Sequence, residues 1–354
     1  MSDKLRILVA MSGGVDSSVV AWLLREEGHE VAGAFMSRGA AGGQVPGGPA
    51  ATADNARRAA EFLKVPLHVL DLAESFDMLI DYFSSEYLRG RTPNPCAICN
   101  PQIKFRKLLE LADSLGMDRL ATGHYARLES LQGRTRLRRG LDPSRDQSYY
   151  LFALPQRFLA RSMFPLGERF KTDVRELACQ AGLPSAETED SQDICFVPDG
   201  EYPRLVRERL GTRVKPGDIV DVHGKVVGRH EGIVDFTIGQ RRGVRVAMGE
   251  PVYVIDIDAA ANRVVVGPAD RLLVGEFTVE NVNWIAADAP GQPLRAGVQI
   301  RYHSKPQPAT ITLAGRYSVH VKFDEPQRAV TPGQCAVFYD DDLLLGGGWI
   351  SRNK

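Results

Sequence analysis

The fold is decided by a short polar stretch near the start of the chain, residues 12–18, which reads Ser12-Gly13-Gly14-Val15-Asp16-Ser17-Ser18. It follows the apolar run Leu5–Met11, which predicts a buried strand, and leads into Asp16–Glu27, whose apolar residues recur at helical spacing. Glycines let backbone N–H groups turn toward an anion, and the helix N-terminus behind them adds a partial positive charge. We therefore interpret the stretch as a phosphate-binding loop in which Asp16 holds a Mg²⁺ ion that bridges the phosphates.

Strand and helix patterns alternate through the first third of the chain. Further strands are predicted at Val31–Met36, Leu67–Leu72 and Arg119–Thr122, and helices at Asp54–Lys64, Phe76–Tyr87 and Ile103–Leu115. Strands separated by helices of this length imply βαβ units and a parallel sheet. Two segments interrupt the pattern. Gly39–Pro49 is predicted to be a mobile loop, and Gly90–Pro101, which holds three prolines, is predicted to be an irregular loop that cannot form a helix.

After about Asp199 the chain changes to short segments rich in Val, Ile, Tyr and Thr, separated by Gly, Pro and Asp. This texture is typical of antiparallel sheets and of a small barrel or sandwich. The predicted strands are Lys225–Gly228, Val252–Ile257, Arg263–Val266, Phe277–Val282, Val298–Tyr302, Thr310–Leu313 and Ser318–Phe323. The predicted fold class is α/β, with an N-terminal parallel-sheet domain, a small central domain and a C-terminal antiparallel β-barrel.

Composition limits the partners and the compartment. A length of 354 residues allows two or three domains at about 150 residues each. Lys plus Arg and Asp plus Glu are both 44, so a nucleic acid must be held by local basic patches. Three such clusters occur, at Arg127–Arg145, Arg204–Lys215 and Arg241–Arg245. No apolar run approaches the ~20 residues of a membrane span and no targeting signal is found, so we expect no membrane partner and a cytoplasmic protein.

Five cysteines, an odd number in a long chain, argue against a disulfide-stapled secreted fold. The close pair Cys96/Cys99 indicates metal or redox chemistry. A structural zinc site needs a second pair, the zinc deaminase signature needs an upstream H-x-E, and a thioredoxin-type pair needs a helix N-terminus where prolines here predict a loop. Cys195 is either a core thiol or a distant partner of this pair, and the residues alone leave both readings open.

Motifs in the same order resemble those of a known family. The phosphate loop resembles the PP-loop of ATP pyrophosphatases, which alone leaves asparagine, GMP and argininosuccinate synthetases and tRNA-thiolating enzymes open. Taken together, the motifs resemble the tRNA-specific 2-thiouridylase (MnmA/TrmU) family. Beyond the loop they are Gly90–Cys96, Cys99-Asn100 with Ile103–Phe105, Ala121–Tyr125, Asp146–Tyr149, Asp190–Phe196, Thr237–Arg241 and Ile300–Tyr302.

The resemblance implies a reaction: ATP adenylates O2 of the wobble uridine (U34) of tRNA, and a cysteine-borne sulfur displaces AMP. Cys99 is then the nucleophile, Cys195 carries a persulfide, and the two can form a disulfide. ATP contacts are implied for Ala10, Met11, Ser12, Gly13, Gly14, Val15, Asp16, Ser17, Met36 and Gly123. Contacts with the base or the tRNA are implied for Asn94, Pro95, Cys96, Arg145, Asp146, Gln147, Arg301 and Tyr302.

The resemblance also implies discontinuous domains and partners. We expect a catalytic domain of residues 1–161 plus 184–202, a central domain of 162–183 plus 203–268, and a barrel domain of 269–354. The expected partners are tRNA, ATP with Mg²⁺, and a sulfur-relay donor protein or cysteine desulfurase, and we expect a monomer. The family usually has Lys where this chain has Arg145, and commonly Lys where it has Thr188, so the contacts made there are in question.

Three alternatives stay open. Cys96, Cys99 and Cys195 could instead ligate a [4Fe–4S] cluster with one iron open for sulfide. A PP-loop amidating ligase acting on a small substrate would give Cys99 and Cys195 no role. An RNA-binding module with a vestigial nucleotide loop would tolerate the loss of Asp16.

Overall fold

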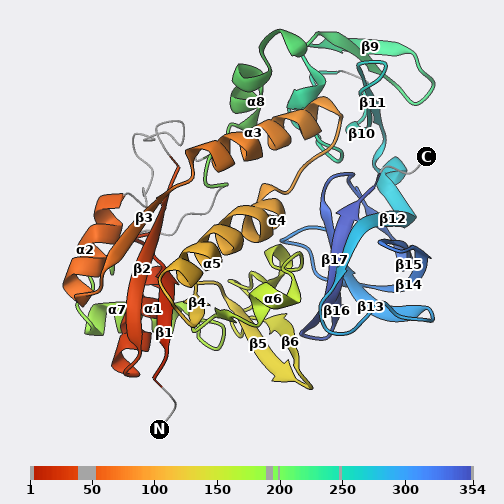
Figure 1. Cartoon of the computed structure of the whole chain (residues 1–354). Helices are drawn as coiled ribbons and strands as arrows, with labels where there is room; N and C mark the ends of the chain where they lie inside the picture. Colours follow the sequence, from red (N-terminus) through yellow and green to blue (C-terminus); the bar gives the residue numbers. More distant parts are fainter. Residues whose placement is uncertain (1–3, 39–52, 189–193, 198–199, 247–248, 352–354) are drawn as a thin grey trace. The chain divides into compact units, whose positions relative to one another are not determined.

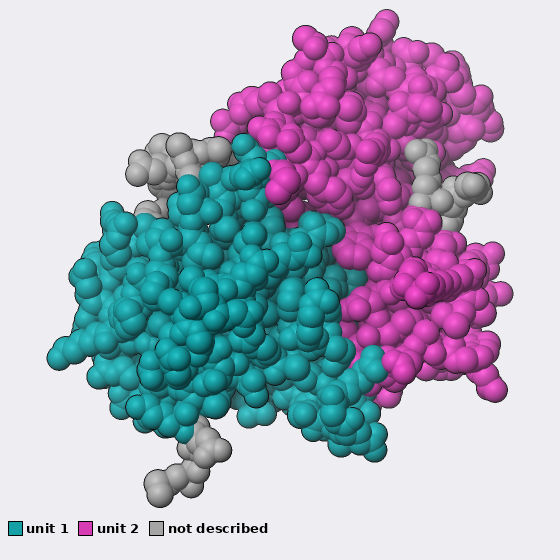
Figure 2. Space-filling view, viewed as in Figure 1, with its two compact units in different colours: residues 1–77, 96–198, 342–345 teal, residues 78–95, 199–341, 346–354 magenta. Residues whose placement is uncertain are grey.

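The computed structural model describes residues 4–38, 53–188, 194–197, 200–246 and 249–351 (Figure 1). The chain forms two compact units, coloured in Figure 2. Unit 1 comprises Met1–Asp77, Cys96–Pro198 and Asp342–Leu345, and unit 2 comprises Met78–Pro95, Asp199–Asp341 and Gly346–Lys354. The predicted loop Gly39–Pro49 lies outside the described residues. Among the described helices, none combines the length and the apolar character needed to cross a membrane.

Unit 1 is built on a five-stranded sheet in the order β3-β2-β1-β4-β7, in which every neighbouring pair is parallel, as predicted. The order reverses beside the first strand, and ligands of open α/β sheets bind at the carboxyl ends of strands at such a point. The strands are β1 (Arg6–Ala10), β2 (Glu30–Ser37), β3 (Leu67–Asp71), β4 (Arg119–Ala121) and β7 (Ser162–Met163).

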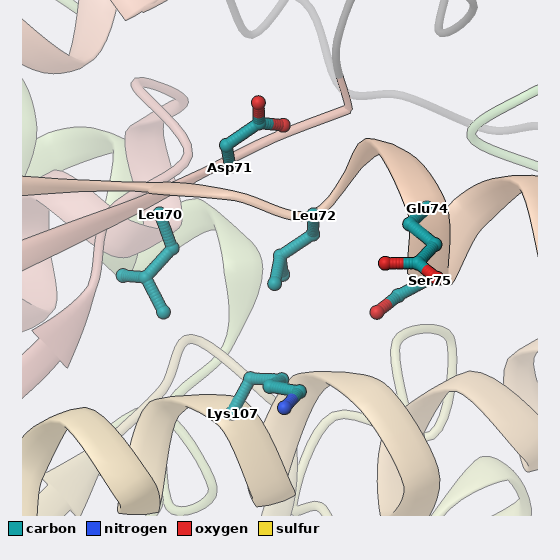
Figure 3. Close-up of a pocket in the computed structure, with 6 residues that line it drawn as sticks. All are labelled: Leu70, Asp71, Leu72, Glu74, Ser75 and Lys107. Atoms are coloured by element: carbon teal, nitrogen blue, oxygen red, sulfur yellow. The ribbon is translucent and has the colours of Figure 1, made fainter.

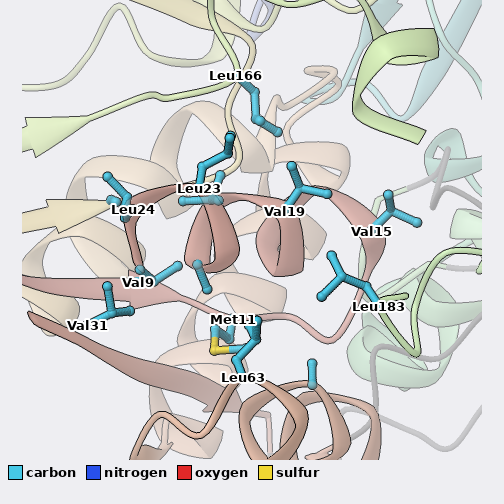
Figure 4. Packing of buried hydrophobic residues seen from close by; sticks show 14 of the residues in the cluster. Val9, Met11, Val15, Val19, Leu23, Leu24, Val31, Leu63, Leu166 and Leu183 are labelled. Atoms are coloured by element: carbon cyan, nitrogen blue, oxygen red, sulfur yellow. The ribbon is translucent and has the colours of Figure 1, made fainter. Parts of the chain in front are cut away.

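The first helix, α1 (Val15–Glu26), packs one side into the core of unit 1 (Figure 4). Val15, Val19 and Leu23 recur every four residues and are all buried, as the apolar spacing predicted. Gly28 follows the helix with a φ of 87°, a conformation that suits glycine after a helix C-terminus. Further helices of this unit are α2 (Ala53–Leu63), α5 (Phe105–Ser114), α6 (Gln156–Leu159) and α7 (Lys171–Gln180).

The prediction that Gly90–Pro101 cannot form a helix is wrong. Pro95–Cys99 is a short helix, α4, and a π-helical turn at Asn100–Lys104 continues it into α5. Pro95 is the first residue of α4, where a missing N–H and a fixed φ are favourable. Pro101 stands in the first turn of this π-helical segment, and the N–H of Phe105 donates to the carbonyl of Asn100, five residues back. Both cysteines of the pair therefore lie on a helix.

A hairpin of β5 (Ala126–Leu131) and β6 (Arg134–Arg139) follows the sheet in unit 1. Leu343 and Leu344, at the start of β17 (Leu343–Ile350), pair with β6. Sequence patterns predicted only a basic cluster here, because arginines occupy both faces of β6 and hide the alternation of a half-buried strand.

Unit 2 contains the predicted C-terminal barrel. Its strands pair in the order β12-β15-β14-β13-β16-β17, and β12 pairs back onto β17, which closes the barrel. Closure gives each of these six barrel strands a partner on both sides. With β17, the strands are β12 (Leu273–Trp284), β13 (Leu294–Gln299), β14 (Gln307–Gly315), β15 (Ser318–Arg328) and β16 (Cys335–Asp340).

A second, four-stranded sheet of unit 2 has the order β10-β11-β8-β9. Its strands are β8 (Gly217–Val220), β9 (Val226–His230), β10 (Tyr253–Asp258) and β11 (Arg263–Gly267). Nearby, the helix α8 (Tyr202–Leu210) packs on the unit 2 part of α3 (Ala73–Leu88). The rings of Tyr87 and Tyr202 stack there with centroids 4.4 Å apart.

The structure groups several segments differently from the expected domains, and the longest of them is 162–183. Residues 162–183, expected in the central domain, lie in unit 1. The strand β7 completes the parallel sheet, and Val174 and Ala178 of α7 pack into the core that α1 also enters. This contact joins parts of the chain about 150 residues apart, which periodicity within α7 alone cannot reveal.

Candidate nucleotide and thiol site

The phosphate loop between β1 and α1 is shaped by its own hydrogen bonds. The Ser17 hydroxyl accepts the Ser12 N–H at 3.1 Å and donates to the Gly14 carbonyl at 3.1 Å. Gly13 has a φ of 81°, and a Cβ there would lie 2.7 Å from the backbone nitrogen of Ala56. Only glycine fits this position. The loop is thus held open for a ligand by packing and internal bonds.

Few loop side chains can reach a nucleotide directly. Met11 and Val15 are buried in the core, and Ala10 ends β1, so these residues can offer only backbone groups. The Ser12 side chain is exposed and Asp16 is partly exposed. Gly14 caps α1 without any side-chain hydrogen bond, which leaves the first N–H groups of the helix directed out of its end. Backbone N–H groups are therefore the main anion donors.

Asp16 is held by two residues that sequence patterns did not single out as site residues. The ammonium of Lys171 donates to Asp16 Oδ1 at 2.7 Å, and the Tyr125 hydroxyl donates to the same oxygen at 2.8 Å. Lys171 is 155 residues from Asp16 and gives no local signal, whereas Tyr125 ends the motif Ala121–Tyr125. The Asp16 side chain keeps 32% of its surface exposed. A partly exposed carboxylate beside an anion loop fits a Mg²⁺ ligand.

Gly123 and Met36 lie at the carboxyl ends of neighbouring strands. A Cβ on Gly123 would lie 3.1 Å from Asp16 Cβ and 3.4 Å from the Ser17 nitrogen, so glycine allows the turn after β4 to press against the phosphate loop. Met36 is half-buried near the end of β2, where it pairs with Leu70 of β3.

A hollow lies at the end of β3 and the start of α3, opposite Lys107 of α5 (Figure 3). Its lining contains none of the predicted site residues. Two of its charged groups also have structural partners: Asp71 accepts the Ala73 N–H at the start of α3, and Lys107 pairs with Glu110 at 3.0 Å. We assign this hollow no role.

The structure brings the three predicted thiols together in unit 1. Cys96 and Cys99 are half-buried on α4, Cys195 is exposed, and all three are free thiols. Burial, with a smaller contribution from the neighbouring Cys195, raises the pKa of Cys99 to about 11 and that of Cys96 to about 12. Thiols influence each other in this way only at short range, so Cys195 lies near the pair on α4.

Lys104 links the thiols to the turn after β4. It acts to lower the pKa of both Cys96 and Cys99, and its N–H donates to the Cys99 sulfur. Its ammonium lies 3.3 Å from His124 Nε2, and His124 Nδ1 lies 2.7 Å from the Thr122 hydroxyl. Burial and then the charge of Lys104 hold the pKa of His124 well below its usual range. His124 is therefore neutral and can accept from Lys104.

Cys195 lies on a short turn that is anchored to unit 1. The N–H of Val197 donates to the Ile194 carbonyl at 2.7 Å, and the Val197 side chain is buried. Arg38, directly after β2, donates to the Cys195 carbonyl. This places the turn at the carboxyl end of the sheet, the end at which the phosphate loop also lies.

The donor set for a metal cluster is not assembled in the described ranges. No group of three or more His, Cys, Asp or Glu side chains in this part of the chain could hold a metal ion.

Asp146 and Gln147, expected at the tRNA, have structural partners. The buried Asp146 carboxylate pairs with Arg139 at 2.8 Å and also accepts the N–H groups of Gly140 and Ser148. Gln147 accepts the Tyr125 N–H at 3.2 Å. These two residues shape the segment, and Arg145 beside them is half-buried.

The remaining predicted contacts lie in several places. Asn94 is buried, and Pro95 begins α4 directly before Cys96. Arg301 donates to the Arg328 carbonyl at 2.6 Å, and the ring of Tyr302 lies against His303. The Thr188 N–H donates to the Ser185 carbonyl at 2.9 Å.

Many arginines of the predicted basic clusters are already paired with carboxylates. These pairs are Arg127 and Arg138 with Asp342, Arg139 with Asp146, Arg207 with Asp235, and Arg209 with Asp81. The third predicted cluster, in unit 2, consists of Arg241, Arg242 and Arg245, and all three are exposed. Close to them, Arg328 lies over the ring of Tyr253 at 4.4 Å, and a hydrogen bond from Arg328, ahead of the charge of Arg241, lowers the pKa of Tyr253. We call Arg241, Arg301, Arg328 and Tyr253 the arginine surface.

Family models define the class. Residues 5–199 match the tRNA methyl transferase HUP domain, 205–268 the tRNA methyl transferase PRC-barrel domain, and 274–350 the aminomethyltransferase β-barrel domain. The chain is thus a three-part protein with a parallel-sheet nucleotide domain, a PRC-barrel and a β-barrel, which confirms the predicted fold class.

Full-length relatives define the family. The chain is 48% identical to the tRNA-specific 2-thiouridylase MnmA of Carboxydothermus hydrogenoformans, over 99% of this chain and 98% of the relative. It is 49% identical to that of Syntrophotalea carbinolica, over 99% and 100%. The chain belongs to the tRNA-specific 2-thiouridylase MnmA family. Among solved structures, it is similar to the U34-tRNA thiolase NcsA of Methanococcus maripaludis with its [4Fe-4S] cluster, at 16% identity and a TM-score of 0.37, covering 60% of this chain and 68% of that one.

Proposed function

We propose that this chain is a tRNA uridine 2-sulfurtransferase that uses ATP to replace O2 of the wobble uridine with sulfur. The observation that carries the proposal is the turn after β4. Gly123 presses on the phosphate loop, Tyr125 donates to Asp16, and His124 holds the lysine beside Cys99. One short segment therefore contacts both a nucleotide site and a thiol site.

The first step activates the uracil oxygen. Uracil C2 carries an amide-like carbonyl without a leaving group. O2 therefore attacks the α-phosphorus of ATP, the bond from Pα to the bridging oxygen breaks, and pyrophosphate leaves. The loop N–H groups hold the phosphates, Asp16 and Lys171 stand beside them, and Met36 contacts the adenine. Bound Mg²⁺ would supply charge neutralisation at the pyrophosphate, with Asp16 as its ligand.

The second step delivers sulfur. The terminal sulfur of a Cys195 persulfide attacks C2, the C2–O2 bond breaks, and AMP leaves with the oxygen. The Cys99 thiolate then attacks the Cys195 sulfur, and the electron pair of the broken S–S bond stays on the sulfur bound to C2. The products are 2-thiouridine and a Cys99–Cys195 disulfide, which an external dithiol reduces. A sulfur-relay protein or a cysteine desulfurase reloads Cys195.

The base reaches the thiols because the wobble position lies in a single-stranded loop, where a nucleotide can be turned out at low cost. Asn94, Pro95 and Cys96, at the start of α4, contact the flipped base, and Arg145 contacts the RNA backbone. The arginine surface of unit 2 binds tRNA phosphates. Tyr302, next to Arg301 in the chain, also contacts the tRNA. The protein acts as a monomer in the cytoplasm, where its tRNA substrate is found.

The [4Fe–4S] alternative keeps the same cysteines and gives them a different role. It predicts iron and acid-labile sulfide in anaerobically purified protein. The persulfide route predicts full thiolation by iron-free, colourless protein.

Thiolation assays of two variants separate the competing functions. A thiouridylase loses thiouridine with both Cys99→Ser and Asp16→Ala. An amidating ligase keeps its activity with Cys99→Ser and releases pyrophosphate without tRNA. An RNA-binding module keeps tRNA binding and its cellular effect with Asp16→Ala. Retention of thiouridine by either variant overturns the proposal.

A further inference from the structure

Lys171 places a buried positive charge beside the phosphate loop. It is the first residue of α7, only 7% of its surface is exposed, and its ammonium lies 2.7 Å from Asp16 Oδ1. Lysine is almost never fully buried unless it is paired. The resemblance gave this residue no role, and the reaction above names it only as a neighbour of Asp16.

Lys171 is held in place from two sides. Its N–H donates to Asp142 Oδ2 at 3.0 Å, and the buried Asp142 also accepts from the N–H and the hydroxyl of Ser144. Its ammonium lies 6.0 Å from the ring centre of Tyr125, whose hydroxyl shares Asp16 Oδ1. Backbone and side chain are both fixed, so the charge is directed at the loop.

The phosphate loop itself contains no positively charged side chain. Residues 10–18 contain no Lys or Arg and one Asp. A triphosphate keeps a net negative charge even when Mg²⁺ is bound, and phosphate loops of other folds add a lysine as a point charge. Lys171 supplies such a charge from a different helix. Because it lies beside Asp16, it can reach the phosphates that Asp16 serves.

We propose that Lys171 is a nucleotide-binding residue, which holds Asp16 when the loop is empty and pairs with the pyrophosphate portion of ATP when the loop is filled. This inference rests on the proposed assignment of the loop as an ATP site. It extends that site to α7, a helix far from the loop in sequence.

Calorimetric binding of ATP and AMP, both with Mg²⁺, tests the inference. Loss of one charge-assisted contact predicts that Lys171→Met weakens ATP binding about 10- to 100-fold. AMP lacks the pyrophosphate portion, so its affinity stays unchanged, and Lys171→Arg restores part of the ATP affinity. The matched control is Lys107→Met, which removes another ion-paired lysine of unit 1 and leaves both affinities unchanged.

Each other outcome has a definite meaning. Equal ATP affinity in Lys171→Met and the unaltered protein overturns the inference, and so does an equal loss for ATP and AMP. If Lys171→Met does not fold, Asp16→Asn is compared with Asp16→Asn/Lys171→Met, because the double variant leaves no unpaired buried charge. The double variant must bind ATP more weakly than Asp16→Asn. If the unaltered protein binds no ATP, the proposed function itself fails.

Discussion

The phosphate loop and the thiol centre are neighbours built in different ways. The loop is a single continuous segment whose shape is fixed by Gly13, Ser17 and the core beneath it. The thiol centre joins Cys96 and Cys99 of α4 to the turn of Cys195 about 100 residues later, and burial keeps the two cysteines of α4 protonated. The phosphate loop is shaped for an anion before any ligand binds. The Cys99 thiol stays protonated, and therefore a poor nucleophile, until the substrate or a partner changes its surroundings. Steps at the two sites should therefore be separable by mutation.

The largest effect is expected at the thiols. Cys99→Ser and Cys195→Ser should each lower multiple-turnover thiolation about 10³-fold or more. Cys195 carries the sulfur that is transferred, and Cys99 breaks the S–S bond that releases the product. Mass spectrometry of digested tRNA measures the thiouridine. Cys99→Ser, assayed without added thiol, should also trap a Cys195–tRNA adduct that dithiothreitol releases. The control is Cys179→Ser, an exposed cysteine of α7, which should keep full activity.

A change at the phosphate loop should stop the earlier step. Asp16→Asn should lower tRNA-dependent pyrophosphate release about 10²- to 10³-fold, because it removes the carboxylate charge and leaves Lys171 unpaired. The thiol centre should be untouched, so Cys99 should react with iodoacetamide as in the unaltered protein. Asp173→Asn, an exposed carboxylate in the first turn of α7, is the control. Equal loss in both variants would contradict a special role for Asp16.

The pH dependence of Cys99 alkylation tests whether the thiol is protonated at neutral pH, which is the proposed difference between the thiol centre and the phosphate loop. With a pKa raised to about 11, the thiolate fraction grows about tenfold per pH unit between pH 7 and 10, and alkylation should rise in parallel. Unfolding lowers this pKa toward about 8.5, so stability should fall as the pH rises from there toward 11. Lys104→Met removes a charge that lowers the pKa and should slow alkylation at pH 8 by about tenfold. A plateau of the alkylation rate above pH 8 would contradict the raised pKa.

The smallest effect is expected on the arginine surface of unit 2, which supplies no reacting group. Arg328→Ala and Arg241→Ala should each weaken tRNA binding a few-fold and reduce the slope of log affinity against log salt by about 1. Arg295→Ala is the control, because this exposed arginine already pairs with Asp324 at 2.6 Å. Filter binding between about 50 and 200 mM salt measures the slope. An unchanged slope in the Arg328 and Arg241 variants would place the tRNA elsewhere.

Local patterns predicted the parts of the molecule that depend on near neighbours. The parallel sheet, α1 with its stop at Gly28, and the barrel strands follow from apolar periodicity and turn residues. The prolines of Gly90–Pro101 predict a loop and hide α4, because Pro95 stands at the first position of the helix, where proline is favourable. The hairpin β5–β6 was missed because its arginines hide the alternation.

Long-range contacts account for what could not be predicted at the site. Lys171 and Tyr125 reach Asp16 across 155 and 109 residues, and no spacing within either segment announces this. The pairing of basic residues with Asp342 and Asp146 was likewise invisible, so charge counts overstated the free positive surface. The approach of Cys195 to Cys99 came from resemblance alone, and the influence of Cys195 on the pKa of Cys99 agrees with it.

The most direct test asks whether activation proceeds when sulfur cannot be delivered. Cys195→Ser is incubated with ATP, Mg²⁺ and tRNA, quenched rapidly, and the intact tRNA is analysed by mass spectrometry. The account predicts tRNA that carries one AMP at the wobble uridine, formed with an equal amount of pyrophosphate and lost when Asp16→Asn is added to the variant. Unmodified tRNA with no pyrophosphate released would contradict the separation of an activating nucleotide site from a sulfur-delivering thiol site.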